Sequence, residues 1–288
     1  MSARQDGLRH GLKTVMNLAA RGCKVIIGDI IDDTKIRDRI IDETTNNLVE
    51  ITHVDLASLK SVRAFAKNIV YTQKRLDILI LMGETGGFSN LYTEDGLLKL
   101  MQVNHFGPFL MTYLLSDLLK KTPGSRVVFV SSLLSLIHKL RNAENLNAAI
   151  PHKNHLMSNI YEYGNSKLCM LMGAQIFSEK LEGVTCFCVF PGISKILINK
   201  SLASSSINTF MRFIYKIIIL FGKDEWERSQ TTIHCAVSKE LHGKPLAIYA
   251  NCYKFPIRPR PLRNKELCDK VWEQSEMLVK IGEEEKIK

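Results

Sequence analysis

The sequence predicts an α/β fold in which a parallel sheet carries helices on both faces. Short continuous apolar runs, such as 126–130, suit strands that are buried on both faces. Longer segments of helical character separate these runs, as the crossovers between parallel strands require. The chain has 288 residues, of which 45% are hydrophobic and 24% charged, which is ordinary for a globular protein. This composition excludes disordered, collagen-like and coiled-coil classes, and a mean hydropathy of −0.02 excludes a polytopic membrane protein.

The first half of the chain alternates helices and strands. We predict a helix over 13–21 that stops at Gly22, because glycine commonly ends helices. The β-rich run 24–28 follows and ends at Asp29. A polar helix over 33–46 precedes a strand over 48–53, and Ser58 can cap a helix over 58–73. The apolar run 76–82 predicts the next strand.

The second half continues the alternation. A long helix is predicted over 94–121, with 123–124 (Pro-Gly) after it. The strand 126–130 leads into Ser131-Ser132, and a helix over 154–181 precedes the strand 184–190. A last strand is predicted over 246–250. Because neither a repeat nor a low-complexity linker divides the sequence, we expect one domain over 1–288.

The charge is the least ordinary part of the composition. A total of 39 Lys and Arg against 29 Asp and Glu gives a net charge of +10. Nucleic acid, anionic lipid or a small anion could account for it. No run of five basic residues occurs, however, which favours a solvated surface. The apolar segment 210–221 is too short to span a bilayer. We expect it to pack on the sheet or cover a site, or else to contact a membrane surface or admit a lipophilic substrate.

The seven cysteines are scattered and form no C-x-x-C pair, so a metal site has little support. Their apolar neighbours suit buried thiols in a reducing compartment. The first 24 residues contain six basic or acidic side chains and no long apolar core, so no secretory signal is expected. These features predict a cytoplasmic protein, either free or peripheral on an intracellular membrane.

Tyr163 and Lys167 are four residues apart, which puts both side chains on one face of a helix. A nearby ammonium favours the phenolate, so such a Tyr can exchange a proton with an alcohol or carbonyl oxygen. A Y-x-x-x-K pair alone is as often accidental as not. Ser131-Ser132 follows a strand at the edge where α/β sheets bind ligands, although a Ser that only caps the strand would look the same. Asn104 lies in a polar interruption of a long helix, and either a water relay or a buried, hydrogen-bonded amide explains it.

A set of motifs in this order resembles the short-chain dehydrogenase/reductases, and the closest branch resembles the retinol dehydrogenases. The motifs lie at 55–63, 76–80, 93–96, 103–105, 130–132, 163–167 and 191–192, and the resemblance runs from about residue 11 to about residue 281. It implies a Rossmann-like fold, a nicotinamide cofactor (NAD or NADP) and hydride exchange between an alcohol and a carbonyl compound.

The resemblance also implies roles for individual residues. Tyr163 is the acid/base, Lys167 lowers its pKa and holds the nicotinamide ribose, Ser132 polarises the substrate oxygen, and Asn104 supports the proton relay. Asp55 would lie beside the adenine, and Pro191-Gly192 beside the nicotinamide. Asp29 suits the ribose 2′-hydroxyl of NAD and repels the 2′-phosphate of NADP, so NAD is preferred. The implied cofactor set is Gly11, Asp29, Asp55, Asn104, Tyr163, Lys167, Pro191 and Gly192.

Departures from the family pattern concentrate on the cofactor side. The three glycines of the phosphate loop fall on Gln5, Arg9 and Gly11, and Arg9 could pair with the pyrophosphate instead. The strand that precedes this loop, which is central in the family's sheet, is not in the sequence. We therefore expect a Rossmann-like sheet without its first strand, which either closes up or keeps a gap of unpaired backbone groups. The segment 81–84 also replaces an N-N-A-G motif.

Two functions are consistent with this sequence. The first is NAD(P)-dependent interconversion of an alcohol and a carbonyl on a small lipophilic substrate, retinoid-like or steroid-like. The second is a catalytically impaired or inactive relative, or a truncated product, that acts as a binding protein. The expected partners are the dinucleotide and the lipophilic substrate, not nucleic acid. A homodimer and a membrane contact through 210–221 stay open.

Overall fold

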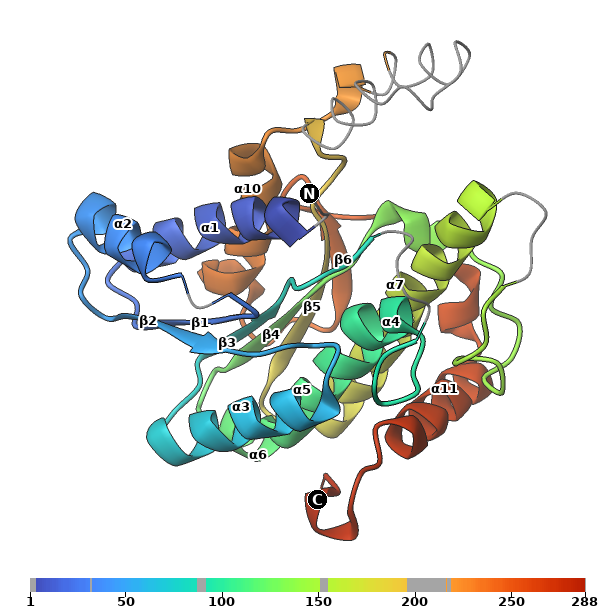
Figure 1. Cartoon of the computed structure of the whole chain (residues 1–288). Coiled ribbons are helices and arrows are strands. Elements are labelled where there is room, and N and C mark those ends of the chain that lie inside the picture. The colour runs from blue at the N-terminus through green and yellow to red at the C-terminus, as the bar shows by residue number, and fades with distance from the viewer. Residues whose placement is uncertain are drawn as a thin grey trace.

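The computed structural model describes residues 4–31, 33–86, 92–150, 155–195, 216 and 219–287, and it has the predicted α/β architecture (Figure 1). Its strands are β1 (Val25–Asp29), β2 (Val49–His53), β3 (Ile78–Leu81), β4 (Arg126–Val130), β5 (Thr185–Phe190), β6 (Ala247–Ala250) and β7 (Tyr253–Lys254). Its main helices are α1 (Arg4–Ala20), α2 (Thr34–Thr44), α3 (Leu59–Thr72), α5 (Gly107–Leu114), α6 (Ser116–Lys121), α7 (His155–Lys180), α10 (Glu225–Val237) and α11 (Lys265–Leu278).

The strands form two separate sheets. β1 pairs with β2, in register from Val25 opposite Val49, and the other five strands follow in the order β3-β4-β5-β6-β7. Every pairing is parallel except that of β6 with β7. The described residues place no strand between β1 and β3, and these two are not hydrogen-bonded to each other. Of the two expected outcomes, the sheet stays divided instead of closing up.

Burial reflects this division. Every residue of β4 and β5 is buried, whereas β1 has none that is fully buried and most of β3 is only partly buried. Strands in the middle of a covered parallel sheet are normally buried on both faces. The facing edges of β1 and β3 also lack a sheet partner for their backbone groups among the described residues.

Helices cover both faces, as Figure 1 shows. α1, α2 and α10 lie on one side, and α3, α5, α6 and α7 lie on the other, with α11 packed on α7. The largest core lies on the α3–α7 side and includes the aromatic rings of Phe109, Phe177 and Trp272. A separate small core around Ala19, Ile40 and Val49 joins α1 and α2 to the β1–β2 sheet.

Local signals located most of the elements. The predicted strands agree with the observed ones within two residues at each end. Gly22 has a φ of +80° directly after α1, the left-handed conformation that glycine adopts easily. Ser58 accepts a hydrogen bond from Ser61 N at the start of α3, as an N-cap does.

Two predicted helices differ from the observed ones. The prediction over 13–21 began too late, because α1 starts at Arg4; without the family's glycines, residues 4–12 have no strong helix breaker besides Gly7 and Gly11. The prediction over 94–121 was wrong as one helix. Gly96, with a φ of +74°, turns the chain first, and helix begins only at Lys99. α10 and α11 were not predicted as helices.

A membrane contact through 210–221 cannot be followed, since of this segment only 216 and 219–221 lie within the described residues. Among the residues that the structure describes, no helix is long and apolar enough to cross a membrane.

Candidate active site

Three side chains from different parts of the chain meet at the carboxyl edge of the larger sheet. Tyr163 and Lys167 lie one turn apart on α7, and Glu84 follows β3. The Tyr163 hydroxyl donates to Glu84 Oε2 over 2.8 Å, and Lys167 Nζ lies 3.0 Å from the same oxygen. The Lys167 ammonium also lies 5.6 Å from the centre of the Tyr163 ring. The predicted Tyr–Lys pair is therefore assembled, with a carboxylate bound to both members.

Lys167 is fully buried, which is rare for a lysine and requires compensation of its charge. It donates a second hydrogen bond to Val130 O, 3.1 Å away at the end of β4. Its own backbone carbonyl accepts from Ser131 Oγ over 2.9 Å. These contacts hold α7 against the end of β4 and fix the ammonium in place.

Glu84 changes the electrostatics of the pair. Burial raises the pKa of Glu84, but the charge of Lys167 and hydrogen bonds from Lys167 and Tyr163 outweigh it and hold the pKa at about 2. Burial and the Glu84 charge together raise the pKa of Tyr163 well above its ordinary value. The carboxylate thus opposes the effect that a lysine beside a tyrosine would otherwise have.

Ser132 lies beside this group, as predicted. Its Oγ accepts from Leu134 N over 3.2 Å, which makes it the N-cap of a short 3₁₀ turn over Leu133–Leu136. A hydrogen bond between Ser132 and Tyr163 works against the rise in the Tyr163 pKa. The hydroxyl is therefore close enough to share a substrate oxygen with Tyr163.

Asn104 lies in a π-helical turn, Gln102–Phe106, between the short helix α4 (Lys99–Met101) and α5. Such turns are frequent at functional sites. Its Nδ2 donates to Thr85 O over 3.0 Å and to Ser166 Oγ over 3.1 Å, and its Oδ1 accepts from Thr85 N over 2.8 Å. The amide is fully buried. It ties the segment that carries Glu84 to α7, and its role in a water relay stays a prediction.

The two aspartates assigned to the cofactor lie at the carboxyl edge of the β1–β2 sheet. Asp29 ends β1 and accepts from Ile31 N over 3.0 Å. Asp55 follows β2 and accepts from Ala57 N over 2.9 Å. Both carboxylates therefore shape the turns that leave their strands. They belong to a different sheet from Tyr163 and Lys167.

The glycines assigned to the cofactor lie in close contacts. Gly11 is inside α1, and a Cβ there would come within 3.2 Å of Met82 Sδ. Gly192 follows Pro191 at the end of β5 with a φ of +94°, and a Cβ there would come within 2.9 Å of the Lys223 side chain. Gly192 is therefore needed for the shape of the turn itself.

These residues fit only part of a nicotinamide dinucleotide. A carboxylate such as Asp29 at the end of a strand suits ribose hydroxyls. Pyrophosphate binding instead needs free N–H groups at the start of a helix. Residues 5–11 lie inside α1, where only the first turn has free N–H groups, and they form no loop. At the nicotinamide end of the expected cofactor site, the Glu84 carboxylate is already bound to both Tyr163 and Lys167. As it is arranged here, the site does not fit a dinucleotide bound through a glycine loop.

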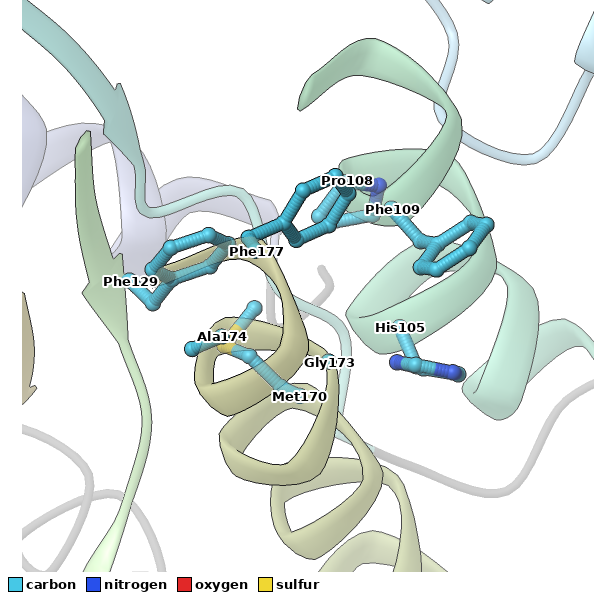
Figure 2. A pocket seen from close by; sticks show the side chains of 8 residues that line it. All are labelled: His105, Pro108, Phe109, Phe129, Met170, Gly173, Ala174 and Phe177. Carbon is cyan, nitrogen blue, oxygen red and sulfur yellow. The ribbon is translucent and has the colours of Figure 1, made fainter. Parts of the chain in front are cut away.

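A pocket lies further along α7, towards its C-terminus (Figure 2). Met170, Gly173, Ala174 and Phe177 line it from α7, opposite rings from the π-helical turn, α5 and β4. Almost all of the lining is apolar. Burial lowers the pKa of His105, its only titratable side chain, to about 3, so this imidazole is neutral at ordinary pH. His105 Nε2 instead bonds Ser275 Oγ over 2.8 Å, which anchors α11. This pocket is a packing defect, not a reaction centre.

In the sequence, Glu84 stood out only because it replaces the glycine of the family's N-N-A-G motif. Its contacts with Tyr163 and Lys167 were not predicted. One signal could have found them. Glu84 follows an apolar strand at the same edge of the sheet as Ser131 and Ser132, since the carboxyl ends of parallel strands meet there.

Comparison with known proteins identifies the family of this chain. A family model described as short chain dehydrogenase matches residues 6–143. Retinol dehydrogenase 12 of Mus musculus is 31% identical over 271 residues, which cover 92% of this chain and 81% of the relative. Retinol dehydrogenase 14 of Mus musculus is 33% identical over 245 residues, covering 83% and 70%. The chain belongs to the short-chain dehydrogenase/reductase family. Within it, the chain falls in the retinol dehydrogenase-like branch.

Solved structures support the fold. An uncharacterized protein from Mycobacterium paratuberculosis aligns with a TM-score of 0.68 at 24% identity, covering 94% of this chain and 90% of that one. L-Sorbose reductase from Gluconobacter frateurii, complexed with NADPH and L-sorbose, aligns with a TM-score of 0.64 at 12% identity, covering 84% and 90%. At these identities the likeness concerns the Rossmann-like fold alone.

Proposed function

We propose that this protein is an oxidoreductase that interconverts an alcohol and a carbonyl group on a small lipophilic substrate, with a nicotinamide dinucleotide as the second reactant. The observation that carries the proposal is the meeting of Tyr163, Lys167 and Ser132 at one point of the sheet edge. Relatives named retinol dehydrogenase support a lipophilic, retinoid-like substrate, and a steroid-like substrate is the alternative.

Each side chain has a distinct role in this proposal. The Tyr163 hydroxyl holds or takes the proton at the substrate oxygen, which is general acid–base catalysis. Ser132 donates a hydrogen bond to the same oxygen and so polarises it. Lys167 stabilises the phenolate of Tyr163 by its charge. Asn104 keeps the surrounding segments in place.

NAD is the preferred dinucleotide in this proposal. The Asp29 carboxylate ends β1 and is only partly buried, so it can accept from a ribose 2′-hydroxyl and repels a 2′-phosphate. The phosphate contacts would come from groups other than a glycine loop. A homodimer and a contact of 210–221 with an intracellular membrane stay predictions, which light scattering and co-sedimentation with vesicles test.

The test combines binding and turnover. Isothermal titration with NADH and NADPH is followed by assays on retinoid and steroid alcohols and aldehydes. Tyr163→Phe is expected to abolish turnover and leave NADH affinity nearly unchanged, whereas Tyr161→Phe, two residues away on α7, keeps turnover. Absence of binding of either dinucleotide at millimolar concentration would exclude the enzyme. Equal turnover in Tyr163→Phe would exclude the role of this hydroxyl.

A specific observation favours a second candidate, a non-catalytic relative that binds lipophilic carbonyl compounds. The Glu84 carboxylate is bound to Tyr163 and Lys167, and residues 5–11 are helical where a glycine loop would bind the pyrophosphate. This candidate expects binding of a retinoid or steroid ligand without affinity for either dinucleotide. The same titrations distinguish the two functions.

A further inference from the structure

We propose that Glu84 is an internal blocking group: its carboxylate closes the reaction centre by binding Tyr163 and Lys167, and it must move away before another molecule can contact either side chain. The claim that this carboxylate blocks a reaction rests on the proposed function. The contact of Glu84 with Tyr163 and Lys167 is independent of that function.

The geometry of the contact carries the inference. One oxygen, Glu84 Oε2, accepts from the Tyr163 hydroxyl at 2.8 Å and pairs with Lys167 Nζ at 3.0 Å. A hydroxyl that donates to a carboxylate cannot donate to a substrate oxygen at the same time, because it has one hydrogen. A single side chain thereby occupies both groups that the proposed reaction needs.

Burial distinguishes this pair from the ion pairs on the protein surface. Lys167 is fully buried and the Glu84 side chain is 26% exposed. The Lys270–Glu266 pair on α11, by comparison, has both side chains more than half exposed. A pair that is largely withdrawn from water is screened less and is costly to break, so the contact is persistent.

The backbone around Glu84 is also held in place. The backbone N–H of its neighbour Thr85 donates to Asn104 Oδ1 over 2.8 Å, and the Thr85 carbonyl accepts from Asn104 Nδ2 over 3.0 Å. The same amide donates to Ser166 on α7, next to Lys167. Asn104 therefore ties the Glu84 segment to the helix that carries Tyr163. Because Glu84 still reaches solvent, its side chain can rotate outward without unfolding this link.

The charged and hydrogen-bonding groups around Tyr163 come from four parts of the fold. Lys167 lies on the same helix, Glu84 follows β3, Ser132 follows β4, and the Arg228 charge on α10 also acts on Tyr163. Arg228 is itself paired with Glu225 at 3.2 Å. Removal of the Glu84 charge leaves Lys167 unopposed next to Tyr163, and the phenolate then becomes easier to form.

The experiment measures the ionisation of Tyr163 directly. The protein is labelled with tyrosine carrying ¹³C at Cζ and titrated by NMR, and Tyr163→Phe assigns the signal among the eight tyrosines. Glu84→Ala removes charge and bulk, and Glu84→Gln removes the charge but keeps the bulk. Glu94→Ala, an exposed carboxylate ahead of α4, is the matched control.

Both Glu84 variants are expected to lower the pKa of Tyr163 by about one to three pH units, and Glu94→Ala to leave it unchanged. NADH affinity, measured by calorimetry, is expected to rise at least about tenfold in Glu84→Ala and less in Glu84→Gln, where the amide still fills the space.

Each outcome decides something. An unchanged Tyr163 titration in the Glu84 variants overturns the inference, whatever the enzyme assays give. If Glu84→Ala does not fold, the titration of Glu84→Gln alone decides. A lowered Tyr163 pKa without dinucleotide binding in any variant supports the blocking contact and overturns the proposed oxidoreductase. Equal NADH affinity in wild type and Glu84→Ala, with binding present, overturns blocking of the cofactor.

Discussion

Replacing Glu84 with Gln should change how the stability of this protein depends on pH. In the folded state Lys167 and Tyr163 hold the pKa of Glu84 at about 2, against an ordinary value of 4.5. That difference is equivalent to roughly 3 kcal/mol of stability at neutral pH, since each pH unit corresponds to about 1.4 kcal/mol. Gln has the shape of a protonated Glu, so the variant lacks this contribution at every pH.

The direction follows from the lowered pKa. Folding favours ionised Glu84, so its contribution is complete above about pH 4.5 and is lost as the pH falls towards 2. The excess stability of wild type over Glu84→Gln should therefore fall from roughly 3 kcal/mol at pH 7 to roughly 1.4 kcal/mol at pH 3. Only the difference between the two proteins is used, because other carboxylates also titrate in this range.

The assay is unfolding by urea at several pH values, followed by the fluorescence of the two tryptophans. Glu266→Gln serves as the control, because its pair with Lys270 lies on the surface and is expected to matter little at any pH. A stability difference between wild type and Glu84→Gln that stays constant from pH 7 to pH 3 would refute the reasoning.

Three further predictions concern packing, the C-terminal segment and cofactor choice. Phe177→Ala removes a buried ring that lies 4.7 Å from the Trp272 ring, and should cost about 3–5 kcal/mol, measured by thermal and urea unfolding. Arg63→Ala removes the bonds to the backbone carbonyls of 279 and 280 and to Glu285, so limited proteolysis should cut the C-terminal segment sooner; unchanged cleavage would contradict this. Asp29→Asn should raise the affinity for NADPH relative to NADH at least about tenfold, and an unchanged ratio in calorimetry would contradict the assignment.

Much of the fold could be predicted from local sequence. Apolar runs located the strands, Ser58 located the start of α3, and Gly22 located the end of α1. These signals act within a few residues of their cause, through capping, turn geometry and burial. The family motifs also predicted that Tyr163, Lys167 and Ser132 would meet, because β4 ends, and the first half of α7 lies, at one edge of the sheet.

Other features could not be predicted from local sequence. A helix over 94–121 fits the local pattern, but Gly96 turns the chain and Asp95 accepts from Leu59 N, a contact between residues 36 positions apart. The start of α1 was misplaced because the family's loop was expected where the sequence forms a helix.

The sequence by itself determined the family, the order of the elements and the set of candidate site residues. Only the tertiary structure decided that the sheet stays divided, since pairing between strands depends on which edges meet in space. It also decided which groups contact each other at the candidate site. Glu84 and Tyr163 are 79 residues apart, and their contact exists only because parallel strands bring β3 and α7 to one edge. Burial first, and the Glu84 carboxylate with it, raise the pKa of Tyr163, whereas the neighbouring lysine alone was expected to lower it.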